Sequence, residues 1–63
     1  MPYKVDYNKI YEYLNTMKDK VVTPSGIAYA VGVERIYPGT MTKLVNDKAI
    51  EHCAEKGFYR VIL

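Results

Sequence analysis

The sequence has no tryptophan, a single cysteine at Cys53, and no long apolar run. A lone cysteine excludes a disulfide bond within one chain, which favours a reducing, intracellular compartment. The longest apolar run is far too short to cross a bilayer. No apolar stretch follows the charges of segment 1–9, which therefore does not resemble a signal peptide. These absences predict a cytoplasmic protein that makes no contact with a membrane.

The sequence also lacks the groups of side chains that catalysis and metal binding require. Its one histidine, His52, precedes Cys53, and a zinc site would need at least two further ligands at suitable spacing. A cysteine nucleophile needs a positioned base, whereas adjacent side chains on a helix diverge by about 100°. We therefore expect no enzyme, no metal and no cofactor, with Cys53 a small buried residue and His52 a surface residue.

The length and charge fit one small domain over residues 1–63. A chain of 63 residues buries only about 60% of the surface that its unfolded form exposes, so its core is small. The net charge of +2 arises from nine basic and seven acidic residues, a balance that permits binding to nucleic acid without indicating it. Seven tyrosines each offer a ring that can be buried and a hydroxyl that can reach phosphate.

Two helices are predicted in the first half of the chain. Asp6 is a good N-cap, and the apolar residues after it recur at helical spacing: Tyr7, Ile10, Tyr11, Leu14 and Met17. Val21 and Val22 favour a brief extended segment. Thr23 then suits an N-cap and Pro24 the first position of a second helix. This second helix should run to about Val31, with Gly32 as its left-handed stop.

The segment around Pro38 predicts the start of a third helix. Proline inside a helix costs about 3 kcal/mol but costs little at a helix start. After an excursion through residues 34–37, we expect one helix from about 39 to 56, straight or bent, ended by Gly57. The apolar residues in the first half of this helix point in a different direction from those in its second half. The alternative is therefore a break at Asn46-Asp47, with a fourth helix capped by Asp47. Residues 58–63 should form a strand that pairs with Val21-Val22.

The resulting order of elements resembles the winged-helix branch of the helix-turn-helix proteins. The residues that carry the resemblance are Ile27, Ala28, Gly32 and Val33, then Thr40, Met41, Lys43, Leu44 and Val45, and finally the segment 55–58. The resemblance implies an α+β fold that is mostly α with a minimal β ladder, in the order α-β-α-α-β. The turn is about three residues longer than the tightest version. One strand after the third helix would leave the wing hairpin absent or reduced to a stub.

The polar residues of the third helix and its turn predict a DNA interface. The major groove of B-DNA, about 12 Å wide, admits one helix. Arg35 and Tyr37 on the turn, and Ser25 at the start of the second helix, are placed to reach phosphates. The residues expected to face the groove are Thr40, Thr42, Lys43 and Asn46.

The function implied is sequence-specific binding to double-stranded DNA by a small transcriptional regulator. A homodimer is expected because the core is small and because an apolar terminal strand would leave an unpaired edge. The alternative is a protein-interaction module on the same scaffold that does not touch DNA. A third interpretation is an RNA-binding winged helix of the ribosomal type, supported only by the run from Thr23 to Ser25.

Overall fold

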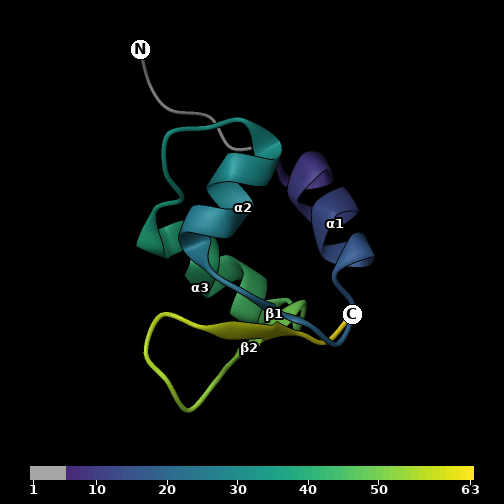
Figure 1. Cartoon of the computed structure of the whole chain (residues 1–63), viewed down its shortest axis with the longest axis vertical. Coiled ribbons are helices and arrows are strands. Elements are labelled where there is room, and N and C mark those ends of the chain that lie inside the picture. The colour runs from purple at the N-terminus through teal and green to yellow at the C-terminus, as the bar shows by residue number, and fades with distance from the viewer. Residues whose placement is uncertain (1–5) are drawn as a thin grey trace.

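Three helices and a small antiparallel sheet make up the described part of the chain, residues 6–63 of a computed structural model. The first five residues of the expected domain lie outside this description. The fold is mixed α+β, as expected (Figure 1). Its elements, in chain order, are α1 (Tyr7–Thr16), β1 (Val21–Val22), α2 (Pro24–Val31), α3 (Pro38–Asn46), β2 (Ile50–His52) and β3 (Tyr59–Val61).

The first two helices begin and end where local side-chain chemistry predicts. The Asp6 carboxylate accepts hydrogen bonds from the backbone N–H groups of Asn8 and Lys9, at 3.0 and 3.4 Å. The Thr23 hydroxyl accepts from the N–H of Gly26 at 3.0 Å, and Pro24 takes the first turn of α2. Both predicted starts are confirmed.

Pro38 opens α3, which confirms the predicted restart of the helix. Tyr37 before it is extended, with φ −77° and ψ 154°, and its carbonyl accepts from the N–H groups of Thr40 and Met41. The long turn between α2 and α3 is fixed by Ile36, whose side chain is only 7% exposed. The added residues therefore contribute to the core.

The predicted helix over 39–56 is wrong, and so is the alternative of a fourth helix capped by Asp47. The helix ends at Asn46, because Lys48 adopts the left-handed conformation with φ 60°. The N–H of Ala49 then donates to the Leu44 carbonyl at 3.0 Å, and the N–H of Lys48 to the Val45 carbonyl at 3.0 Å. This pair of bonds is a Schellman motif, which reverses the chain and directs Ala49 into the core.

The same motif ends α2. Gly32 has φ 77°, its N–H donates to the Tyr29 carbonyl at 3.3 Å, and the N–H of Val33 donates to the Ala28 carbonyl at 3.0 Å. The two helix ends differ in the residue at the left-handed position, which is glycine in α2 and lysine in α3.

The sheet has the order β1-β3-β2, with both pairs antiparallel. β3 pairs with β1 as predicted, since Val22 lies opposite Tyr59. A hairpin of β2 and β3 is also present, so the expectation that it would be absent or a stub is wrong. Gly57, with φ 88°, belongs to the turn of this hairpin and does not end a helix. Because β3 is the central strand, the expected unpaired edge on it is wrong as well.

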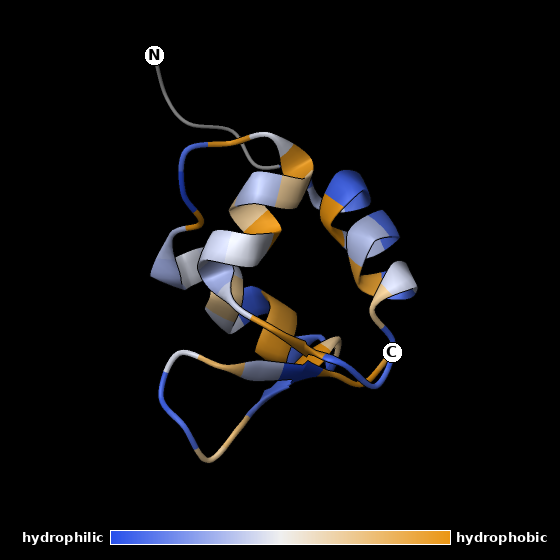
Figure 2. Cartoon of the chain, viewed as in Figure 1, coloured by the Kyte–Doolittle hydropathy of each residue, from blue (hydrophilic) through white to orange (hydrophobic). Residues whose placement is uncertain are grey.

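The core lies between the helices and one face of the sheet. Figure 2 shows apolar stretches of the helices and the sheet turned toward one another. The largest side chains that are fully buried are Ile10, Leu14, Ile27, Leu44, Ile50 and Val61. Leu44 and Ile50 fix α3 to the sheet, and this contact determines which face of α3 remains exposed.

We predict that substitutions at the two left-handed positions have opposite effects. Gly32→Ala should lower the free energy of unfolding by about 1 kcal/mol, because a side chain disfavours this backbone conformation. Lys48→Gly should raise it by up to about 1 kcal/mol for the same reason. Urea denaturation measures both effects.

Gly39→Ala is the matched control. An added Cβ meets no heavy atom within 4 Å at either Gly32 or Gly39, but only Gly32 has a positive φ. A loss of stability at Gly39 equal to that at Gly32 would contradict the conformational explanation.

Candidate nucleic-acid interface

The side chains of α3 divide into a buried face and an exposed face. Met41 and Leu44 are buried, whereas Thr42, Lys43 and Asn46 are exposed. At about 100° per residue, the three exposed positions lie within about 100° of arc, with Asn46 between the other two. The structure therefore brings three of the four predicted groove-facing residues onto one face.

The predicted surface position of Thr40 is wrong. Its side chain is only 6% exposed. Thr40 lies one turn before Leu44 and next to Met41, and this places it on the side of α3 that packs into the core. Val45, which was expected on one apolar face with Met41 and Leu44, packs against the core at the edge of that face and is half-buried. Thr40 therefore belongs to the core and not to the interface.

Thr42 lies on the flank of α3 that faces the β2–β3 hairpin. Its hydroxyl donates to the Pro38 carbonyl at 3.0 Å. It lines a depression of about 240 Å³ whose wall also includes His52 and Tyr59 of the hairpin, together with Pro24, Ile36, Pro38, Met41 and Val45. The rings of His52 and Tyr59 are 4.9 Å apart. Sequence reasoning missed His52 here because it assigned residues 50–52 to a helix.

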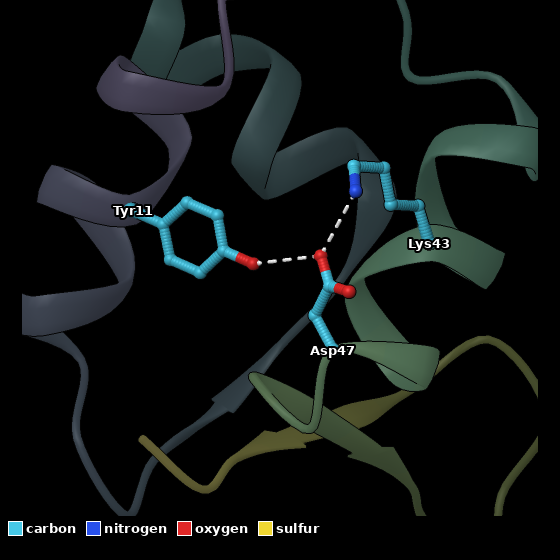
Figure 3. A network of polar contacts seen from close by, with 3 residues as sticks. All are labelled: Tyr11, Lys43 and Asp47. Carbon is cyan, nitrogen blue, oxygen red and sulfur yellow. Dashed lines mark hydrogen bonds and ion pairs between the residues drawn. The ribbon is translucent and has the colours of Figure 1, made fainter.

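Lys43 lies on the opposite flank, toward α1. Its Nζ forms an ion pair with Oδ2 of Asp47 at 3.1 Å and lies 5.5 Å from the centre of the Tyr7 ring. The hydroxyl of Tyr11 donates to the same Asp47 oxygen at 3.3 Å (Figure 3). Asp47 thus joins α1 to the end of α3.

This network raises the pKa of two of its members. The hydrogen bond and the charge of Asp47 raise the pKa of Lys43 above its usual value of 10.5. Burial is the largest cause that raises the pKa of Tyr11 above 10.0, followed by the charge and the hydrogen bond of Asp47. Both shifts stabilise the protonated forms of the two side chains, which are the forms that bind Asp47.

A second depression, of about 380 Å³, lies between the start of α2 and the following turn. Its wall includes Ser25, Tyr29, Glu34 and Arg35. The Arg35 guanidinium carbon lies 4.9 Å from the centre of the Tyr37 ring. Because Pro24 and Ile36 line both depressions, the two adjoin.

Tyr29 is the residue of this second depression that sequence reasoning left without a role. It is 90% exposed and lies one helical turn after Ser25, on the side of α2 away from Ile27. The available signal was its position outside the apolar face of α2. A solvent-facing tyrosine beside serine and arginine is suited to phosphate contact.

Three observations on residues 6–63 concern other functions that a chain can have. Among these residues, no three His, Cys, Asp or Glu side chains are grouped closely enough to hold a metal ion. Cys53 carries a free, half-buried thiol, whereas it was expected to be fully buried. Over the same range, every helix is too short or too polar to cross a bilayer.

Comparison with models of protein families, with curated proteins and with solved structures found no match to this chain. The candidate interface is therefore defined by its geometry alone: the exposed face of α3, the depression beside Arg35, and the hairpin.

We predict that the Tyr11–Asp47–Lys43 network is lost at alkaline pH. Because the pKa values of Tyr11 and Lys43 are raised in the folded protein, their contribution to stability is present below about pH 10 and disappears as pH rises through the folded values. Asp47→Asn should lower the pKa of the Tyr11 phenol, which an alkaline titration monitored by ultraviolet absorbance measures. Tyr11→Phe shows which part of the absorbance change belongs to Tyr11.

The stability measurement is the difference in free energy of unfolding between the wild type and Asp47→Asn. This difference should be constant up to about pH 10 and decrease above it, because the attraction within the network ends when its donors lose their protons. A difference that stays constant above about pH 10 would show that the protonation of these donors does not contribute to stability.

Proposed function

We propose that this chain is a small, sequence-specific DNA-binding protein, a transcriptional regulator that inserts the exposed face of α3 into the major groove. The observation that carries the proposal is the grouping of Thr42, Lys43 and Asn46 on one face of α3. The Thr42 flank of this face borders the depression beside the hairpin, which adjoins the Arg35 depression. The order α-β-α-α-β-β with a small antiparallel sheet is similar to that of winged-helix proteins, which supports the same proposal.

The three side chains offer different contacts to base edges. Asn46, in the middle of the face, can pair with adenine through two hydrogen bonds, and Lys43 can contact guanine or phosphate. The Thr42 hydroxyl already donates to the Pro38 carbonyl, so its methyl group remains to contact the methyl of thymine. Asn46 is therefore the residue that we assign to sequence discrimination.

The residues around the second depression fit the role of phosphate contacts. Ser25 and Tyr29 carry hydroxyls and Arg35 carries a guanidinium, the groups that bind phosphate oxygens. Tyr37 lies under the Arg35 guanidinium and can hold it in place. Glu34 in the same depression reduces the positive charge, so affinity should depend on few contacts.

We predict that duplex binding weakens steeply with salt and depends on these groups in two separable ways. Arg35→Ala should weaken binding to all sequences and reduce the dependence of log K on log salt by about 0.9, the value of one phosphate contact. Asn46→Ala should cost about 1–3 kcal/mol at one base pair and leave the salt dependence unchanged.

Selection from random duplexes, followed by fluorescence anisotropy on the selected site, measures both effects. Lys18→Ala is the matched control, since it removes one positive charge from the turn after α1, outside the candidate interface. Equal losses for Lys18→Ala and Arg35→Ala would point to charge alone. No binding to any duplex at low salt would refute the proposed function.

The second candidate function is a protein-interaction module that does not bind DNA. The observation that favours it is the depression beside α3, whose wall is formed largely by apolar residues. A partner would insert an apolar side chain there, and its binding would change little with salt. The salt dependence of binding therefore separates the two functions.

We further propose a homodimer through the face of the sheet that points away from the helices. Val21, Phe58 and Ile62 are 46, 40 and 41% exposed. Glu51 and Arg60 lie opposite each other on β2 and β3 of this face. A second copy related by a two-fold axis would cover the apolar side chains and pair each Arg60 with the partner subunit's Glu51, which makes the surface self-complementary.

We predict a mass of about twice 7.2 kDa in analytical ultracentrifugation at micromolar concentration. Phe58→Ser together with Val21→Ser should give the monomer, because the apolar contact is removed. Tyr29→Ser, which removes an exposed ring from α2, should leave the dimer unchanged. A wild-type monomer under these conditions would refute the dimer without affecting the proposed function.

A further inference from the structure

Asp47 binds the cation that the proposed interface would offer to DNA. One atom, its Oδ2, accepts from the Lys43 ammonium on α3 and from the Tyr11 hydroxyl on α1. Lys43 also lies near the face of the Tyr7 ring, so two groups contact its Nζ, the Asp47 carboxylate and this ring. Tyr11 holds the carboxylate from the α1 side (Figure 3). Among residues 6–63 this is the one ion pair.

The Asp47 carboxylate accepts a hydrogen bond from one of the three ammonium N–H groups of Lys43 and neutralises much of its charge. A DNA phosphate that approaches Lys43 would therefore compete with Asp47 for this cation. The side chains of Lys43 and Asp47 are 52 and 41% exposed, and an exposed ion pair is weak enough to exchange partners. The pair can therefore open, and until it does the charge of Lys43 is largely compensated by Asp47.

Resting on the proposed function, we infer that Asp47 is a specificity-determining residue that competes with DNA phosphate for Lys43. Binding to DNA of arbitrary sequence depends on cations that reach phosphates. With Lys43 paired to Asp47, this non-specific binding has one cation fewer. A cognate site supplies additional base contacts along α3, which offset the cost of opening the pair. Asp47 thus removes a larger share of the binding free energy from non-cognate DNA, which depends on phosphate contacts alone, than from the cognate site.

The test uses the full chain and a random-sequence duplex, with affinity measured by fluorescence anisotropy over a range of salt. Asp47→Asn should bind about five- to tenfold more tightly at low salt, and the dependence of log K on log salt should become steeper by about 0.9. Asp47→Ser should behave in the same way, which guards against an effect of the asparagine amide.

Glu34→Gln is the matched control for charge. It removes one negative charge from the second depression, without contact to Lys43, and should improve binding by at most about twofold. In a Lys43→Met background, Asp47→Asn should improve binding no more than Glu34→Gln does. Asp47→Asn should also lower the pKa of the Lys43 ammonium, measured by NMR without DNA.

Several results would overturn the inference. The inference fails if Asp47→Asn improves binding no more than Glu34→Gln does, if the improvement persists in the Lys43→Met background, or if Asp47→Asn weakens binding. It also fails if Asp47→Asn leaves the pKa of Lys43 unchanged. If the wild type binds duplex and Asp47→Asn is no better than Glu34→Gln, only the inference fails. If neither protein binds duplex at low salt, the proposed function fails with it.

Discussion

The reversal of the chain between Asn46 and Ala49 is the constraint on which the rest of the structure depends. Two hydrogen bonds from the backbone of Lys48 and Ala49 end α3, and the next residue, Ile50, enters the core as the first residue of β2. A helix that continued past Asn46 would leave β3 with one neighbour in place of two. The same reversal places Asp47 where it can reach both Lys43 and Tyr11.

The sequence predicted those element ends that depend on a local side chain. Asp6, Thr23, Pro24, Gly32 and Pro38 each act on the backbone within a few residues, so their effect can be read without knowledge of the fold. The end of α3 has no such signal, because a lysine takes the left-handed position that glycine takes in α2. The strand that follows has only three residues and forms through pairing with β3, a contact distant in sequence.

The error at Thr40 comes from the apolar face that the sequence indicates for the start of α3. Met41, Leu44 and Val45 define a face that leaves Thr40 outside it. The observed helix packs a face centred on Thr40, Met41 and Leu44, so Thr40 moved from the surface to the core. Thr42, Lys43 and Asn46 kept their exposed positions. Their neighbours, His52 on one flank and Asp47 on the other, became visible only with the tertiary structure.

Pro24 and Ile36 form the wall between the two depressions beside α2 and α3. Ile36 is buried inside the long turn, so the extra residues of that turn supply part of the boundary between the two depressions. The molecule therefore offers a ligand two adjoining points of attachment.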